Sequence, residues 1–185
     1  MNPLPLFLII VTLPLLLVGC GGDKKEPVAE VKPVEEVPVK SNLKYEIKGD
    51  GVTITGCDKK ASGALIIPAT IEGKTVTSIG TSAFHNCTRL TSITIPDSVT
   101  SIGLVAFFKC TTLTSITIPD SVISIGDFTF RDCTNMTAIT FLGDAPKVAG
   151  NAFEEAPPII YRKPEANGWG DSFGGRPVKL ISEKP

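Results

Sequence analysis

The stretch from Val76 to Ser98, VTSIGTSAFHNCTRLTSITIPDS, decides the fold, because the chain repeats it twice more. The second copy, VTSIGLVAFFKCTTLTSITIPDS, begins at Val99, and the third, VISIGDFTFRDCTNMTAITFLGD, begins at Val122. The copies therefore start at equal intervals, with no insertion between them. A fixed period in the twenties is typical of a solenoid, in which each coil buries its apolar face against its neighbours.

Each copy contains two strand-like phrases. Residues 91–95 (TSITI) alternate polar and apolar side chains, and Pro96 ends the strand because it cannot donate to a ladder. Residues 99–102 alternate again, and residues 106–110 have room for one helical or 3₁₀ turn. We predict a mainly β fold, with 23-residue coils of parallel strands and short helical turns, neighbouring strands lying about 4.8 Å apart.

Stacking of the coils is expected to place residues at equivalent repeat positions above one another. Three interior ladders are expected to form the core: Ile93, Ile116 and Ile139; Leu90, Leu113 and Met136; and Phe84, Phe107, Phe130 and Phe153. Phenyl rings at that spacing can stack with an offset, which orders the core beyond simple area burial.

The repeat pattern LxxIxIPxSVxSIGxxAFxxCxxL resembles the leucine-rich repeats of BspA-like bacterial and protozoal surface proteins. One copy fills it with Leu90, Ile93, Ile95, Pro96, Val99, Ile102, Gly103, Ala106, Phe107 and Cys110. The resemblance covers about residues 45–161 and implies a short leucine-rich-repeat solenoid that binds host protein, matrix or neighbouring cells. The last coils depart from the pattern at Thr129 and Ala156, and the register is predicted to fail after Ile159, as expected of capping coils.

The N-terminus predicts a lipid-anchored envelope protein. Residues 5–18 are almost all apolar, which is typical of a secretory signal. The following LVGC, residues 17–20, resembles a bacterial lipobox, which implies cleavage before Cys20 and membrane attachment through a lipid on that thiol. No Lys or Arg precedes the apolar run, so an ordinary secretory signal is the alternative. The lipobox implies a bacterial cell-envelope location, at the outer membrane or the cell surface.

These features divide the chain into five predicted parts. They are a lipoprotein signal peptide (1–19), the lipidated Cys20 with a disordered Pro/Glu/Val/Lys tether (20–42), an N-terminal segment leading into the solenoid (43–75), the leucine-rich repeats (76–161) and a C-terminal cap and tail (162–185).

Composition and residue spacing argue against nucleic-acid binding, metal binding and catalysis. The formal net charge is −1, so no electrostatic field favours nucleic acid. The one histidine, His85, has no Ser or Cys nucleophile placed by sequence to use it, and we expect it on the surface. Cysteines that recur only once per repeat do not have metal-site spacing, so we predict no metal, no cofactor and no enzyme activity. Asp97 and Asp120 recur at one edge as exposed turn residues.

The cysteines of the repeat are interpreted as small buried apolar residues. Cys87, Cys110 and Cys133 follow the phenylalanine ladder by three residues and are expected to face inward. Successive coils would bring them within disulfide reach, which leaves a covalent pairing as the alternative. Cys57 lies before the first copy and is free or packed.

The outward positions of the strands form the candidate binding surface. We define the Ser/Thr face as Ser92, Thr94, Ser115, Thr117 and Thr140, with Ala138 interrupting it. The function expected is a non-catalytic binding or adhesion module for a protein or surface glycan. The alternative function is a structural, envelope-organising lipoprotein that contacts another envelope component. Ordinary strand propensity of Thr also explains the pattern.

Overall fold

The computed structural model describes residues 42–185. The predicted signal peptide (1–19), the lipidation site Cys20 and nearly all of the tether lie outside the described residues. Within the described part, no helix has the length and apolar character needed to cross a membrane.

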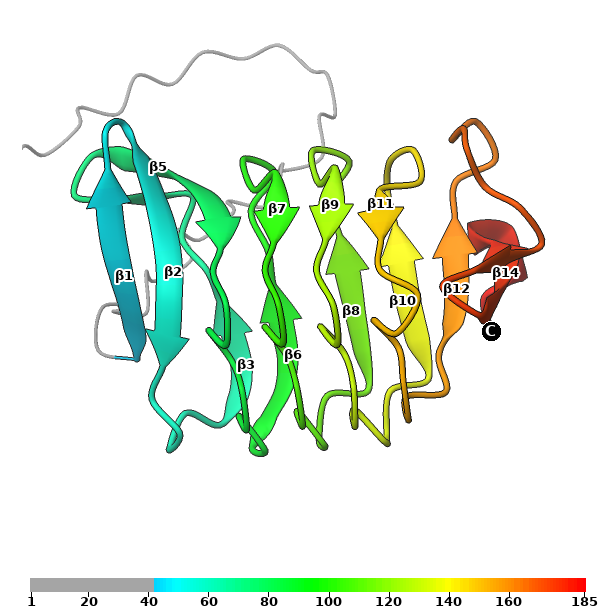
Figure 1. Cartoon of the computed structure of the whole chain (residues 1–185), viewed down its shortest axis with the longest axis horizontal. Helices are drawn as coiled ribbons and strands as arrows, with labels where there is room; N and C mark the ends of the chain where they lie inside the picture. Colours follow the sequence, from blue (N-terminus) through cyan, green and yellow to red (C-terminus); the bar gives the residue numbers. More distant parts are fainter. Residues whose placement is uncertain (1–41) are drawn as a thin grey trace, which may run out of the picture. The chain divides into compact units, whose positions relative to one another are not determined.

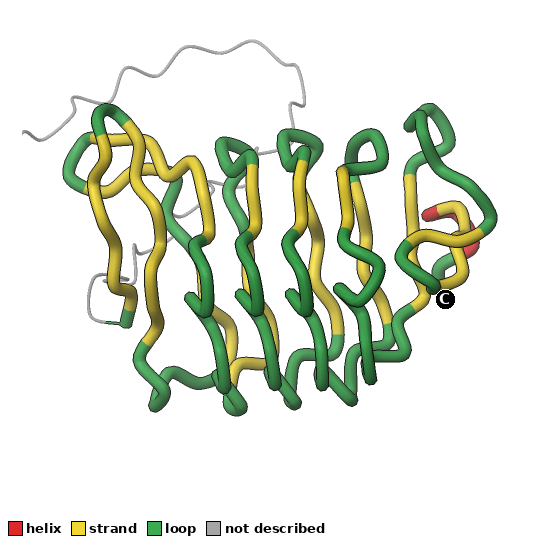
Figure 2. The backbone as a smooth tube through the Cα atoms, viewed as in Figure 1, coloured by secondary structure: helices red, strands yellow, loops and turns green. Residues whose placement is uncertain are grey.

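The chain winds as a solenoid with two strand-bearing sides (Figures 1 and 2). The first side is a sheet in the order β1 (Leu43–Lys48), β2 (Gly51–Cys57), β5 (Lys74–Ile79), β7 (Ser101–Ile102), β9 (Ser124–Ile125) and β11 (Lys147–Val148), with β4 (Thr70–Ile71) paired to β5. The second side holds β8 (Ser115–Ile118), β10 (Ala138–Phe141), β12 (Ile159–Arg162), β14 (Arg176–Leu180) and β13 (Ser172–Phe173). The pair β3 (Gly63–Ile66) and β6 (Leu90–Thr94) continues this second row beside β8.

The predicted period is confirmed by the strand register. Ile79 pairs with Ile102 and Ile102 with Ile125 on the first side, each partner lying one full repeat further along the chain. On the second side, Ser115 pairs with Ala138 at the same spacing. The parallel ladders therefore follow directly from the sequence repeat.

The end of the repeat differs from the prediction. Ala138 pairs with Ile159, so this coil is shorter than the others by two positions. The shift falls before Ile159, where two consecutive prolines offer no ladder donor. The predicted loss of the repeat register therefore occurs, but before Ile159 rather than after it, and strand pairing continues to Arg162 and on to β14.

The third side of each coil consists of turns rather than the predicted helical turns (Figure 2). Val105 and Lys109 adopt left-handed φ values of 48° and 57°, which interrupt a right-handed helix on both sides of Ala106–Phe108. The N–H groups of Val105 and Phe107 instead donate to the carbonyls of Asp127 and Thr129 in the next coil. Among the described residues, the one helix is the 3₁₀ turn η2 (Ile181–Glu183).

The three predicted ladders form the core. All their residues are buried, and the phenyl rings of Phe84, Phe107, Phe130 and Phe153 stack with centroids 5.1, 5.3 and 5.7 Å apart. Thr129, which replaces the usual Ala, is fully buried, and its hydroxyl donates to the carbonyl of Gly126 at 2.7 Å. A bonded hydroxyl can be tolerated in this interior.

The repeated glycines permit close approach between coils. A Cβ on Gly126 would lie 2.7 Å from the Leu104 nitrogen and 2.9 Å from the Gly103 carbonyl carbon. Both distances are shorter than nonbonded contacts allow, so only glycine fits where the backbones touch.

Both ends of the core are closed. At the N-terminal end, the antiparallel hairpin β1–β2 lies against β5 through parallel pairing of β2. At the C-terminal end, Trp169 and Phe173 pack on Phe141, with ring centroids 5.0 and 5.4 Å away. The atypical last segment therefore covers apolar surface that another coil would otherwise bury.

Candidate binding surfaces

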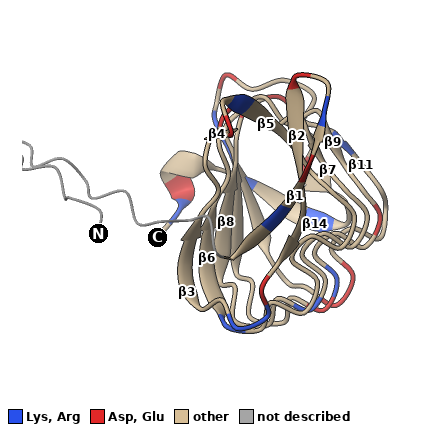
Figure 3. Ribbon diagram, turned by 90° about the vertical axis from the view of Figure 1, so that its left-hand side faces the viewer, with Lys and Arg blue, Asp and Glu red and all other residues tan. Residues whose placement is uncertain are grey.

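Four members of the Ser/Thr face lie together on the second side of the solenoid. Ser92 and Thr94 on β6 and Ser115 and Thr117 on β8 are exposed. They alternate with buried isoleucines, as the period of a strand requires. Viewed from the N-terminal end, β3, β6 and β8 carry no charged residue (Figure 3). The result is a neutral surface of hydroxyl groups.

A hollow of about 390 Å³ runs along this surface. The four hydroxyl residues line it, and Asp97, Pro119 and Leu142 border it. Hydroxyl groups both donate and accept hydrogen bonds, while the carboxylate of Asp97 accepts them. The hollow can therefore accommodate a polar group of a partner beside an apolar one.

Thr140 is not part of the exposed surface, which corrects the prediction. Its side chain is only 4 % exposed, because β12 places Tyr161 beside it and the C-terminal tail crosses it. Lys184 donates a hydrogen bond to the Thr140 hydroxyl at 3.2 Å and lies 5.7 Å from the centre of the Tyr161 ring. The exposed Ser/Thr face thus comprises two coils and ends at the tail.

A second surface, which the sequence reasoning missed, lies on the turn side. We define the aromatic column as His85, Phe108, Arg131 and Glu154, which occupy the same position in four successive coils. The rings of His85 and Phe108 stack at 5.1 Å with an interplanar angle of 3°. The Arg131 guanidinium lies 6.0 Å from the Phe108 ring and forms an ion pair with Glu154 at 3.4 Å. Because all four residues fall at the same position of the repeat, the sequence alone could have indicated that they lie side by side.

His85 is half-buried rather than a simple surface residue. Burial lowers the pKa of its imidazole, and the ammonium groups of Lys59 and Lys109 lower it further. The ring is therefore held neutral at physiological pH, in a form suited to stacking on Phe108.

The turn side carries further apolar side chains besides the aromatic column. Leu104 is 44 % exposed, and the half-buried Phe128 ring lies 5.2 Å from the Arg131 guanidinium. Aromatic and arginine side chains are enriched in the energetic centres of protein interfaces. The turn side therefore carries the residue types that the Ser/Thr face lacks.

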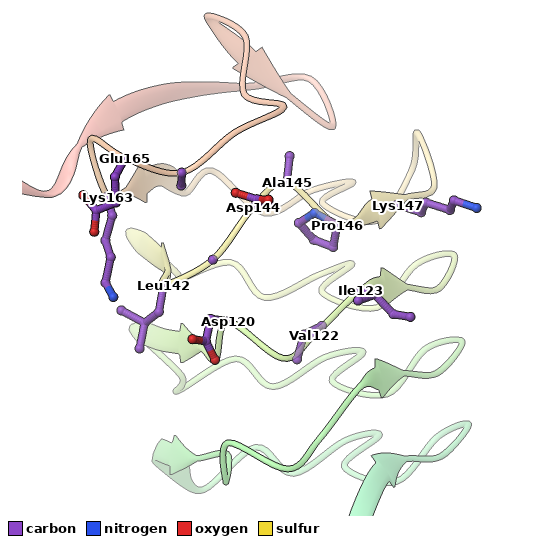
Figure 4. A pocket seen from close by; sticks show the side chains of 12 residues that line it. Asp120, Val122, Ile123, Leu142, Asp144, Ala145, Pro146, Lys147, Lys163 and Glu165 are labelled. Atoms are coloured by element: carbon purple, nitrogen blue, oxygen red, sulfur yellow. The ribbon is translucent and has the colours of Figure 1, made fainter.

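A further hollow, of about 630 Å³, lies where the coils turn from the second side to the first (Figure 4). The exposed Ile123 lines it together with Leu142 and Pro146, and its charged groups come from Asp120, Asp144, Lys147, Lys163 and Glu165. Asp144 accepts hydrogen bonds from the backbone and side-chain amides of Asn167, so it stabilises the local turn. The lining contains no His, Ser or Cys.

Residues 42–185 contain no group of three or more His, Cys, Asp or Glu side chains able to hold a metal ion. The aspartates that recur at one edge of the repeat are found in two coils only. Asp97 and Asp120 are exposed, and Gly143 takes the next position, where its carbonyl accepts a hydrogen bond from the Trp169 indole at 3.3 Å.

The cysteines of the described chain are buried free thiols, as the packed interpretation predicted: Cys57, Cys87, Cys110 and Cys133.

The coils of parallel strands stack on one another, and each places a leucine or methionine and a phenylalanine at equivalent interior positions, which defines a leucine-rich-repeat solenoid. The family described as "BspA type Leucine rich repeat region" matches residues 65–162 in six copies. The chain therefore belongs to the BspA-type leucine-rich-repeat family, whose repeats are consistent with a binding or structural module.

Solved structures of similar proteins agree with this assignment. A leucine-rich-repeat protein from Bacteroides capillosus is 31 % identical over 66 % of this chain and 94 % of that chain, with a TM-score of 0.56. The leucine-rich-repeat protein of T. pallidum is 25 % identical over 66 % of this chain and 69 % of that chain, also with a TM-score of 0.56. A leucine-rich cell surface protein from Faecalibacterium prausnitzii shares the fold at 24 % identity over 85 % of this chain and 44 % of that chain, with a TM-score of 0.54. No curated protein matches the chain.

Proposed function

We propose that this protein is a non-catalytic binding module of the bacterial cell surface. It is anchored through a lipid on Cys20 and contacts a protein or surface glycan with its Ser/Thr face. The observation that carries the proposal is the row of four exposed hydroxyl side chains along a hollow on a regular parallel sheet. No other element among the described residues covers that row.

The rigidity of the sheet supports a binding role. Ser92, Thr94, Ser115 and Thr117 alternate with isoleucines that are locked in the core, so their positions are fixed before a partner arrives. A surface that is already ordered loses little conformational freedom on binding. The neutral character of the face favours an uncharged polar partner over a strongly charged one.

The surface location rests on the N-terminal sequence and on the relatives. Residues 17–20 resemble a lipobox, and one protein with the same fold is described as a cell surface protein. A Pro- and Glu-rich segment after Cys20 would separate the repeats from the bilayer.

The aromatic column is a second candidate contact within the same function. Phe108, Arg131 and Leu104 offer the aromatic, cationic and apolar groups that commonly anchor interfaces. Contact through this column would place the partner on the turn side of the solenoid, outside the Ser/Thr face.

Protease treatment of intact cells tests the display of the repeats at the surface. We expect trypsin, added outside, to cleave in the Lys-containing segment 23–41 and release a fragment that contains the repeats, while a periplasmic control protein stays intact. A repeat domain that remains cell-bound until the outer membrane is opened would contradict surface display. It would favour the alternative of an internal, envelope-organising lipoprotein.

A further inference from the structure

Charged residues on the turn side of the solenoid are sorted by sign along its length. We define the polarised face as the five successive turns 58–60, 81–86, 104–109, 127–132 and 150–155. The first three turns, with the exposed Arg89 just beyond the second, carry one acidic residue and four basic residues: Asp58, Lys59, Lys60, Arg89 and Lys109. The last two turns carry one basic residue and four acidic residues: Arg131, Asp127, Asp132, Glu154 and Glu155. One half of the face is therefore net positive and the other half net negative.

Few of these charges are neutralised within the chain. Arg131 and Glu154 form an ion pair at 3.4 Å, the one ion pair of these turns among the described residues. Lys59 donates a hydrogen bond to the His85 carbonyl and keeps its positive charge. The other charged side chains include four that are exposed in the turns themselves: Lys60, Lys109, Asp127 and Glu155. Both halves of the face therefore present charge to the solvent.

Apolar side chains lie where the sign of the charge changes. Leu104, which is 44 % exposed, and the half-buried Phe108 belong to the last basic turn, and the half-buried Phe128 belongs to the first acidic turn. The two turns are neighbours, because the Lys109 N–H donates to the Arg131 carbonyl at 3.0 Å. An apolar centre with a polar surround is the usual composition of a protein interface.

A face of this composition is complementary to a second copy of itself. In a two-fold symmetric contact, both subunits use the same surface patch. If the axis passes between turns 104–109 and 127–132, the two solenoids run antiparallel, and the basic half of each lies against the acidic half of the other. The two apolar centres then meet at the axis. A parallel arrangement would instead oppose like charges, which is unfavourable.

We propose that the protein forms a two-fold symmetric dimer through the polarised face, with the two solenoids antiparallel. The Ser/Thr face lies on the strands of the second side, so the dimer leaves it free and presents two copies of it. Five turns spaced about 4.8 Å apart extend over only about 20 Å, so the buried area is small and the dimer is weak. The proposal does not depend on the function of the Ser/Thr face.

Cysteine crosslinking in cells tests the dimer with the full chain. Leu104→Cys places an exposed thiol at the centre of the polarised face, and Thr117→Cys places one on the Ser/Thr face as a control. Two differently tagged copies of each variant are co-expressed and treated with a short, membrane-permeant bismaleimide. We expect a crosslinked dimer that carries both tags from Leu104→Cys, in several-fold higher yield than from Thr117→Cys. No dimer from Leu104→Cys, or equal yields from the two positions, would overturn the proposal.

Charge reversal tests the antiparallel arrangement, with the crosslinking thiol kept at residue 104. The basic set consists of Lys60→Glu, Arg89→Glu and Lys109→Glu, and the acidic set consists of Asp127→Lys, Asp132→Lys and Glu155→Lys. Either set alone gives both halves of the face one sign and should lower the yield of crosslinked dimer several-fold. The two sets together invert the polarity of the face, so they should restore the yield.

A third set controls for net charge. It consists of Lys48→Glu, Lys147→Glu and Lys179→Glu, which change the net charge as much as the basic set but lie on exposed strand positions outside the polarised face. This control should leave the yield unchanged. Restoration by the combined sets separates a lost interface from a lost fold, because further substitutions would not refold a damaged protein. Yields that neither set lowers, or a combined variant that remains uncrosslinked, would contradict the antiparallel dimer.

Discussion

The ammonium of Lys184 donates a hydrogen bond to the hydroxyl of Thr140, 44 residues earlier in the chain, at 3.2 Å. This contact lays the C-terminal tail across the last part of the Ser/Thr face and over the Tyr161 ring. The tail residues themselves are exposed, so the contact is weak and separable from the core.

Removal of residues 181–185 is expected to uncover Tyr161. The chain has two tyrosines, and Tyr45 lies in β1, far from the tail in sequence. Nitration of Tyr161 by tetranitromethane should be slow in the full chain, where its side chain is 4 % exposed, and several-fold faster after truncation. The rate at Tyr45 serves as the internal control. Equal Tyr161 rates in both proteins would mean that the tail does not cover this end of the face.

Gly126→Ala is expected to destabilise the solenoid by about 1–3 kcal/mol, because the added methyl group must displace backbone of the preceding coil. Gly150→Ala is the matched control, since a Cβ there meets no atom within 4 Å. Urea unfolding of both variants measures the difference. A loss for Gly126→Ala no greater than for Gly150→Ala would refute the close approach of the coils.

The stability of the protein should depend on pH through His85. Its pKa is lowered in the folded state, so the unfolded chain binds a proton that the folded chain resists. Stability from this residue is therefore present above the unfolded pKa of about 6.5 and decreases as the pH falls below it. His85→Phe keeps an aromatic ring on Phe108 without the titrating group. As the pH is lowered from neutral to mildly acidic, we expect the unfolding temperature of this variant to fall less than that of the parent, and an identical fall would contradict the assignment.

Cys20→Ala should release the protein from membranes. Without the thiol there is no acceptor for the lipid, and among residues 42–185 no helix could replace the anchor. Fractionation of cells expressing the variant measures this, with Cys57→Ala as a control that retains the predicted lipid site. Continued membrane association of Cys20→Ala would reject the lipobox interpretation.

The sequence was sufficient to predict the solenoid, because its period sets both the register and the core. The interior ladders at Ile93, Leu90 and Phe84 follow from that period and were confirmed. The turn conformation could not be predicted in the same way. Residues 106–110 suit a helical turn by composition, and Val105 is an unfavourable residue for a left-handed φ. Hydrogen bonds to the next coil, which local sequence does not reveal, determine the conformation instead.

The candidate surfaces were predictable only in part. The outward direction of Ser92, Thr94, Ser115 and Thr117 followed from strand alternation. The burial of Thr140 depends on a tail lysine 44 residues away, so no local pattern could indicate it. The aromatic column required a comparison of different residue types at one repeat position, whereas the ladders of like residues were visible at once.

Site-specific photo-crosslinking in living cells tests the central claim most directly. A photoreactive residue is placed at Thr117 on the Ser/Thr face, at the exposed Leu104 on the turn side, or at the exposed Thr134 outside both surfaces. The proposed function predicts a discrete crosslinked product from Thr117 and none from Thr134. Products from Leu104 or Thr134, with none from Thr117, would contradict binding through the Ser/Thr face.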